Sequence, residues 1–169
     1  MRTDRLAYAL ALATCIVPLW VTHYLPFVDQ PQHLHLIAVL THLGDQSTVY
    51  PQLFQIRGTV TPYLGYYAIV SALSRLTGIE VANKMFLSAY VIAMPLSMAF
   101  LLRSLGRPAW PSLLSLPFAY GDNLAWGFIN FCAALPVTYV SCGLCVRAIT
   151  DRRRSRTIAV WLADRKSVV

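Results

Sequence analysis

The sequence predicts an all-α protein of the integral membrane class, a polytopic helix bundle with about four transmembrane helices. Of its 169 residues, 57% are hydrophobic and 12% are charged, whereas soluble domains carry about 25% charged residues. The mean hydropathy is +0.54. The formal net charge of +7 comes from basic residues at the ends of apolar runs and in one tail. That distribution is typical of a membrane topology signal and argues against a nucleic-acid partner.

The first predicted transmembrane helix covers residues 6–27. Its length suffices to cross roughly 30 Å of hydrocarbon. Arg2 and Arg5 precede it, and Trp20 and Tyr24 stand near its other end. Because basic residues favour the cytoplasmic side and Trp and Tyr favour the interfaces, the N-terminus is expected to be cytoplasmic.

Residues 28–80 are expected to form an extracytoplasmic loop that carries surface helices. A helical apolar pattern after Asp29 ends at Gly44-Asp45 and is too short to span a bilayer. Residues 46–61 are polar and predict a loop. A Pro-led, Tyr-rich segment at 62–76 predicts a second short helix, either a surface helix or a short span.

Three further apolar runs follow the loop, and the chain then becomes basic. The pattern predicts transmembrane helices at 81–102, 108–121 and 124–146, of which the second is short and interrupted by prolines. Residues 147–169 predict a basic cytoplasmic tail. An inner or plasma membrane, with both termini cytoplasmic, is the expected location.

The positive-inside rule favours four spans over five. With four, the cytoplasmic side holds most of the basic residues, and three remain outside: Arg57, Arg75 and Lys84. If 62–76 also spans, either the basic tail or the N-terminal arginines lie outside. Four spans place Asp29 and Asp122 on the same extracytoplasmic face, whereas five spans place them on opposite faces.

Asp29 lies in the corner between the first span and the surface helix. Two interpretations of it stay open. Asp29 is a helix N-cap, with Pro31 in the first helical turn, or it is a catalytic base at the outer membrane surface. His33 follows one helical turn later on the same face as Asp29.

A metal site is not predicted in this region. His35 and His42 share a helix face, but His33 does not lie on it, so the three histidines form no good ligand set. The sequence identifies no cofactor, and a divalent cation stays open.

Several short motifs follow one another in a recognisable order. They are Asp29-Gln30-Pro31-Gln32-His33, Leu43-Gly44-Asp45, Pro62-Tyr63-Leu64-Gly65-Tyr66-Tyr67, Leu76-Thr77-Gly78 and Leu105-Gly106-Arg107. In order and spacing they resemble the amino-terminal part of the GT-C superfamily of membrane glycosyltransferases, particularly the protein-mannosyltransferase and aminoarabinose-transferase branch. The chain departs from that pattern at Gln30, where the family has a second acidic residue. It departs again at Thr61, where a lysine thought to hold the lipid phosphate is common.

The resemblance implies transfer of a sugar from a polyprenyl-phosphate donor, with membrane lipid as a further partner. Asp29 would be the catalytic base and Asp122 the second catalytic acid of a later outer loop. Arg57 would take the place of the missing lysine. The implied substrate-binding residues are His33, Arg57, Tyr63 and Tyr66, although the tyrosines fit an interfacial aromatic belt equally well.

The resemblance also implies further helices, so the chain is expected to be part of a longer protein. A non-enzymatic membrane protein, such as an assembly factor, a scaffold or a transporter fragment, is the alternative. A transporter is disfavoured because the spans carry few ionisable residues.

Overall fold

The computed structural model describes residues 2–58 and 63–151, and every regular element in these ranges is helical. The elements are α1 (Arg2–Val21), α2 (Gln30–His42), α3 (Tyr50–Leu53), α4 (Leu64–Thr77), α5 (Ile79–Ser104), the 3-10 helix η1 (Trp110–Leu114), α6 (Ser115–Ala119), α7 (Asp122–Trp126) and α8 (Ile129–Asp151). The all-α class is confirmed. Thr61, together with residues 152–169 of the predicted tail, lies outside the described residues.

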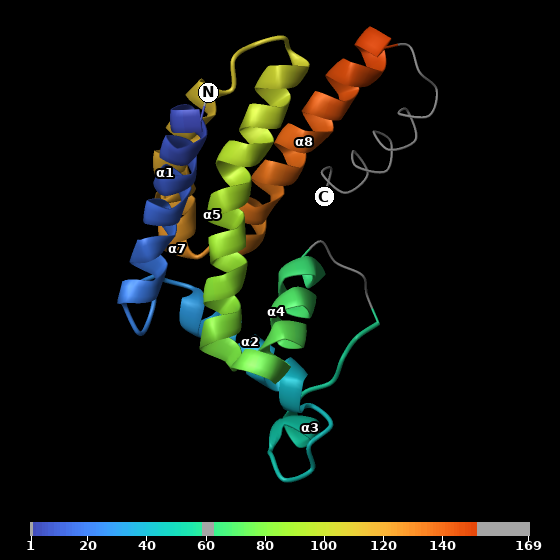
Figure 1. Ribbon diagram of the computed structural model, residues 1–169. Helices are drawn as coiled ribbons and strands as arrows, with labels where there is room; N and C mark the ends of the chain where they lie inside the picture. Colours follow the sequence, from blue (N-terminus) through green and yellow to red (C-terminus); the bar gives the residue numbers. More distant parts are fainter. Residues whose placement is uncertain (1, 59–62, 152–169) are drawn as a thin grey trace.

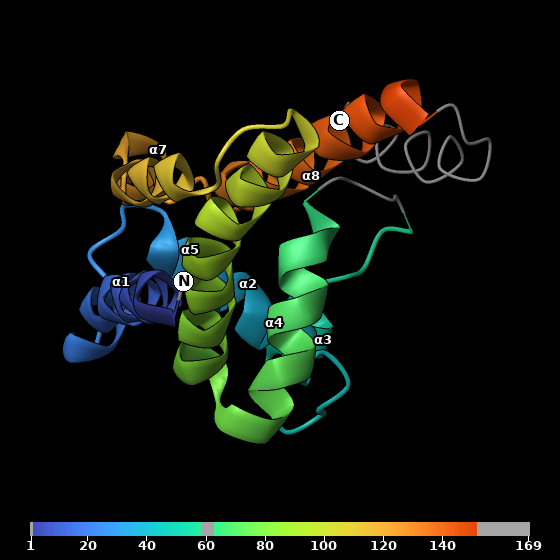
Figure 2. The same cartoon turned by 45° about the horizontal axis from the view of Figure 1, so that its top comes forward.

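Helix α5 is the centre around which the other helices pack. It lies between α1 and α4, with α8 against its C-terminal half (Figures 1 and 2). Pro95 lies within the helix without ending it. The buried side chains of Leu87, Val91 and Met94 form the middle of the core. An apolar helix that is covered on several sides is expected to have this all-round hydrophobic character.

Side-chain contacts fix the direction of each long helix relative to α5. The Tyr8 hydroxyl donates to the Pro95 carbonyl oxygen at 3.2 Å, and Trp20 Nε1 donates to Ser88 Oγ at 3.0 Å. Helix α1 is therefore antiparallel to α5. Arg147 Nε donates to Ser104 Oγ at 2.9 Å near the ends of both helices. Since the start of α8 lies beside the middle of α5, α8 is parallel to α5 (Figure 1).

The segment from η1 to α6 runs beside α1 in the same direction. Ser112 Oγ lies 2.9 Å from the Tyr8 hydroxyl, and the Tyr120 hydroxyl donates to the Cys15 carbonyl oxygen. The chain thus descends along α1, rises along α5, descends again through this segment and rises along α8. The ends of the first and third passes consequently meet, which places α7 next to the start of α2.

Three predicted spans differ from the observed helices. The span predicted at 124–146 is interrupted at residues 127–128, so its first residues belong to α7, and α8 continues past its predicted end to Asp151. Helix α1 ends at Val21, so residues 22–27 form a loop where the sequence predicted the last turns of the span. The predicted span at 108–121 consists of η1 and α6, which are short helical pieces with Pro111 and Pro117 in their first turns. Hydropathy identifies an apolar run but does not show whether its backbone forms one continuous helix.

Among the described residues, two helices are long and apolar enough to cross a membrane, Ile79–Ser104 and Ile129–Thr150. Leu6–Val21 is a shorter apolar helix. The segment predicted as an outer loop contains the helices α2 and α4, and the single turn α3 lies in the stretch predicted to have no helix. Four membrane spans are not confirmed by these lengths.

Candidate functional site

The corner that precedes α2 is held against the end of α7 by backbone hydrogen bonds. The Val28 N–H donates to the Ala125 carbonyl oxygen at 3.0 Å, and the Asp29 N–H donates to that of Trp126 at 3.2 Å. Helix α7 begins with Asp122, whose side chain is exposed. The structure therefore brings the helix that carries the second predicted acid to the backbone of the first.

Gly127 ends α7 and makes this contact close. Its φ is +90°, a left-handed conformation that favours glycine. A Cβ atom built on Gly127 would lie 2.9 Å from the Cβ of Asp29 and 3.0 Å from its backbone nitrogen. Both the backbone angle and the lack of space therefore require glycine beside Asp29.

His33 joins three elements at the same corner. Its Nε2 lies 2.9 Å from the Gly127 carbonyl oxygen, and its Nδ1 lies 2.7 Å from the Tyr67 hydroxyl. Because a carbonyl oxygen only accepts, Nε2 carries the proton, and in the neutral ring Nδ1 accepts from Tyr67. The imidazole thus links α2 to α4 and to the end of α7. Both ring nitrogens are occupied by protein contacts, so the predicted substrate-binding role would require one of them to be released.

Asp29 occupies the N-cap position of α2 but does not cap the helix with its side chain. The Asp29 carboxylate makes no capping hydrogen bond, and Pro31 stands in the first turn. The Asp29 carbonyl oxygen accepts from the His33 N–H at 3.1 Å. The interpretation of Asp29 as a side-chain cap is therefore wrong. Asp29 is half-buried, and its backbone N–H and carbonyl oxygen are both hydrogen-bonded.

Tyr66 is a core residue of α4. Its side chain is 2% exposed, and its hydroxyl donates to Asn83 Oδ1 at 2.7 Å. Its ring meets those of His33, Tyr67 and Phe86 edge-on, with centroids 5.0 to 5.7 Å apart. Burial raises the pKa of Tyr66, and the neighbouring Tyr67 raises it further. Tyr66 therefore contributes buried packing contacts to the site and does not expose its hydroxyl.

Tyr63 and Arg57 lie away from this packed corner. Tyr63 precedes α4 and is exposed, and Arg57 is exposed between α3 and α4. Tyr67 is half-buried, and its pKa is raised by burial and, to a smaller extent, by Tyr63. Of the predicted binding residues, the structure therefore joins His33 and Tyr66 and leaves Tyr63 and Arg57 on the surface.

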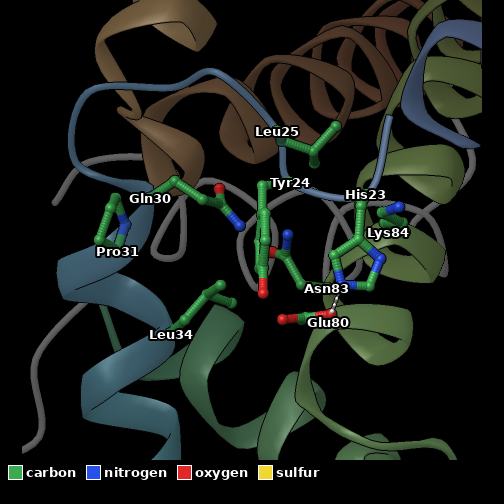
Figure 3. A pocket seen from close by; sticks show the side chains of 9 residues that line it. All are labelled: His23, Tyr24, Leu25, Gln30, Pro31, Leu34, Glu80, Asn83 and Lys84. Carbon is green, nitrogen blue, oxygen red and sulfur yellow. Dashed lines mark ion pairs between the residues drawn. The ribbon is translucent and has the colours of Figure 1, made fainter. Parts of the chain in front are cut away.

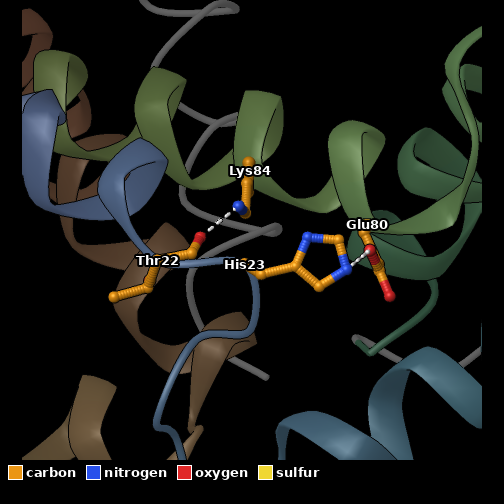
Figure 4. Close-up of polar contacts among 4 residues, drawn as sticks. All are labelled: Thr22, His23, Glu80 and Lys84. Atoms are coloured by element: carbon orange, nitrogen blue, oxygen red, sulfur yellow. Dashed lines mark hydrogen bonds and ion pairs between the residues drawn. The ribbon is translucent and has the colours of Figure 1, made fainter.

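Lys84 is a functional candidate that the sequence analysis counted only as an outer basic residue. It lies on α5 with 8% of its surface exposed, and its Nζ donates to the Thr22 carbonyl oxygen at 2.6 Å (Figure 4). Its Nζ also lies 5.9 Å from the centre of the Trp20 ring. A lysine inside an otherwise apolar run was the available signal, because such a charge needs a partner.

A cavity of about 330 Å³ lies between the loop after α1, the start of α2 and the start of α5 (Figure 3). Its most buried polar lining residues are Gln30, Asn83 and Lys84. At its exposed side, His23 Nε2 lies 3.5 Å from a Glu80 carboxylate oxygen (Figure 4). The remaining lining is mostly apolar: Tyr24, Leu25, Pro31 and Leu34. Gln30, which lines the cavity, directly follows Asp29 in the sequence, so both residues lie at the start of α2.

No group of three His, Cys, Asp or Glu side chains that could hold a metal ion occurs within residues 2–58 and 63–151. The described part of the chain therefore assigns no ligands to the divalent cation that the sequence left open.

No protein-family model matches the chain, and no curated protein or solved structure is significantly similar to it.

Proposed function

We propose that the chain is a membrane glycosyltransferase that transfers a sugar from a polyprenyl-phosphate donor at the extracytoplasmic face. The supporting observation is the Asp29 carboxylate, which stands at a helix start without capping it. A half-buried carboxylate with no capping role, held in a rigid corner, is suited to accept a proton. The order of motifs that resembles the GT-C superfamily supplies the substrate class.

The proposed reaction is a direct displacement with inversion. The acceptor hydroxyl oxygen forms a bond to the anomeric carbon of the sugar while the bond from that carbon to the phosphate oxygen breaks. The hydroxyl proton passes to the Asp29 carboxylate, and the polyprenyl phosphate leaves with the bonding electron pair. Asp122, the first residue of α7, is the proposed second acid at the same membrane face as Asp29.

The proposed placement is integral to an inner or plasma membrane, with both termini cytoplasmic. The directions of α1, α5 and α8 and of the η1–α6 segment agree with an alternation between two faces. In this arrangement α2, α3 and α4 lie together at one end, opposite the N-terminus (Figure 1). That end is the proposed extracytoplasmic side.

An Asp29→Asn substitution in the full-length protein tests the proposal. Membranes that contain the variant are incubated with a radiolabelled polyprenyl-phosphate sugar, and the label that leaves the donor lipid is measured. Loss of a general base is expected to lower transfer by about 10²- to 10⁴-fold. Unchanged transfer at normal expression would refute a catalytic Asp29.

Asp45→Asn is the matched control. Asp45 is an exposed acid of the same outer segment, and its side chain accepts hydrogen bonds from the Ser47 N–H and hydroxyl. These two bonds hold the pKa of Asp45 below its usual value. The control is expected to keep wild-type transfer because the Asp45 carboxylate takes part only in its own turn.

A structural role for the corner is the second candidate function, and the His33 contacts favour it. Both ring nitrogens of His33 serve to join α2, α4 and the end of α7, which is sufficient for a scaffold or assembly protein. In that case Asp29→Asn would leave every transfer assay unchanged, whereas His33→Ala would lower the thermal stability of the protein.

A further inference from the structure

Lys84 carries a charge that the described part of the chain does not balance. Its Nζ donates to one carbonyl oxygen, that of Thr22, and no carboxylate lies within ion-pair distance of it among the described residues. An ammonium group has three donors, and a buried charge without a counter-ion is costly. Glu80, one helical turn away on α5, pairs instead with His23. Two Lys84 donors therefore remain available.

A simpler role for Lys84 is to stabilise the end of α1. The Thr22 carbonyl follows the last turn of that helix, where a cation interacts favourably with the helix dipole. Such an interaction stabilises a helix only modestly. It leaves the charge and two donors of Lys84 unmatched, so it does not account for the burial of this residue next to a cavity.

Gln30 supplies a second, independent sign of a missing ligand. Its side chain is 4% exposed, and its Oε1 is buried without a hydrogen-bond partner. Leaving such an acceptor without a hydrogen-bond partner destabilises the folded protein. The amide of Gln30 points into the same cavity as Lys84 (Figure 3). Because Oε1 is itself buried, it can meet a ligand in the cavity only after rotation about the last side-chain bond exchanges the oxygen and the nitrogen of the amide.

The walls of the cavity match an amphipathic ligand. Leu25, Leu34 and Pro31 provide apolar surface in the same lining as the charged Lys84, and Trp20 lies next to Lys84. A phosphate ester offers several oxygens to the two available Lys84 donors, and lysine is a common phosphate binder. The volume of about 330 Å³ accommodates a head group of modest size.

We infer that this cavity binds the phosphate group of a lipid phosphate ester, with Lys84 as its cationic partner and the Gln30 amide bonded to an adjoining hydroxyl. The inference deepens the proposed function and rests on it for the identity of the ligand, which would be the polyprenyl-phosphate donor. The sequence led us to expect that the exposed Arg57 would hold the lipid phosphate, and this inference assigns that role to Lys84 instead. Asp29 does not line the cavity but directly precedes Gln30, so the inference requires the sugar of a donor held here to extend out of the cavity toward Asp29.

Binding of farnesyl phosphate to the purified full-length protein in detergent tests the site. Calorimetric titration is expected to show binding of farnesyl phosphate and none of farnesol, which lacks the phosphate. Inorganic phosphate is expected to bind at least tenfold more weakly because it leaves the apolar walls unfilled. Equal affinity for inorganic phosphate would overturn the lipid assignment.

Lys84→Met removes the charge and keeps the length of the side chain. A hydrogen bond to a charged group is worth about 1.5–3 kcal/mol, so the affinity for farnesyl phosphate is expected to fall by roughly 10- to 100-fold. Lys84→Arg is expected to retain most of the affinity. Arg75→Met, at an exposed basic residue of α4, is the control and is expected to bind like wild type. Unchanged affinity in Lys84→Met would overturn the site.

Photo-crosslinking of the wild-type protein covers the case in which Lys84→Met fails to fold. A diazirine analogue of farnesyl phosphate is expected to label peptides that contain residues 22–34 or 79–84. Labelling confined to other peptides would overturn the site without any substitution.

The two proposals fail in different ways. Asp29→Asn is expected to bind farnesyl phosphate like wild type while losing transfer. Binding through Lys84 without sugar transfer by the wild type would refute glycosyl transfer alone. Transfer by the wild type, together with unimpaired binding by Lys84→Met, would refute the phosphate site alone.

Discussion

Gly127 lies so close to Asp29 that a Cβ atom on the glycine would stand 2.9 Å from the aspartate Cβ. This contact joins the end of the third pass of the chain to the beginning of α2. Asp29 is held there by two neighbouring backbone hydrogen bonds to Ala125 and Trp126. The position of the proposed catalytic carboxylate therefore depends on a glycine far away in the sequence.

Gly127→Ala is expected to destabilise the protein and to displace Asp29. The φ of +90° costs a residue with a Cβ about 1–2 kcal/mol, and the contact with the Asp29 backbone adds to that cost. A lower thermal unfolding midpoint in detergent and reduced sugar transfer are the expected readouts. Gly65→Ala is the control, since Gly65 lies in α4 with open space around it. Equal midpoints for the two variants would contradict this prediction.

Tyr66→Phe is expected to change how stability depends on alkaline pH. The pKa of Tyr66 is raised above its usual value of 10.0, first by burial. The folded protein therefore keeps the phenol proton more tightly than the unfolded chain does. Below pH 10 this difference has no effect, and as the pH rises above 10 the unfolded chain ionises and stability falls. The variant should lose less stability between pH 9 and pH 11 than wild type does.

At neutral pH the same substitution leaves the buried Asn83 Oδ1 without its donor. The expected loss is about 1–3 kcal/mol, measured as a lower thermal midpoint at pH 7. Tyr63→Phe, at an exposed tyrosine, is expected to leave the midpoint at pH 7 unchanged. A Tyr66→Phe midpoint equal to that of wild type at pH 7 would show that the bond to Asn83 contributes nothing.

Gly143→Ala is expected to disturb the packing of α8 on α5. A Cβ atom at this position would lie 2.6 Å from Cε1 of the Phe100 ring, which would have to move. The Arg147 guanidinium lies 4.3 Å from the centre of that ring and would lose its support. Overpacking of this kind costs about 1–3 kcal/mol, measured as a lower unfolding midpoint.

A smaller residue at Phe100 supplies the control for this prediction. The double variant Gly143→Ala with Phe100→Leu is expected to be more stable than the sum of the two single effects, because the smaller side chain relieves the clash. Strict additivity would mean that the two residues do not interact.

Reporter fusions test the proposed membrane topology. Fusions after Gly78 and after Asp122 are expected to report the extracytoplasmic side, and a fusion after Arg107 the cytoplasmic side. The basic residues near the ends of the passes supply the physical reason. Cytoplasmic reports after both Gly78 and Asp122 would indicate that residues 62–76 also span, in which case Asp29 and Asp122 could not share a site in the membrane.

Local chemistry accounts for what could be predicted around the outer helices. The sequence places a helix start between Asp29 and Pro31, puts His33 one turn later and ends the next helix before Gly78, and the structure has α2 and α4 at these positions. Each of these features depends on residues within a few positions of one another. The prediction of Asp29 as a side-chain cap was wrong because the cap position does not show where the carboxylate points.

The sequence by itself determined the helical class, the apolar runs and the corner at Asp29, because periodicity, proline and glycine act over short stretches of chain. Only the tertiary structure decided that Gly127 abuts Asp29, that His33 bonds to Tyr67 and that Lys84 lies beside a cavity with an unpartnered Gln30. His33 and Tyr67 are 34 positions apart in the sequence, and Asp29 and Gly127 are 98 positions apart. The cavity beside Lys84 is lined by three separate elements: the loop after α1, α2 and α5. These contacts arise from how the helices pack around α5, which no local pattern of residues specifies.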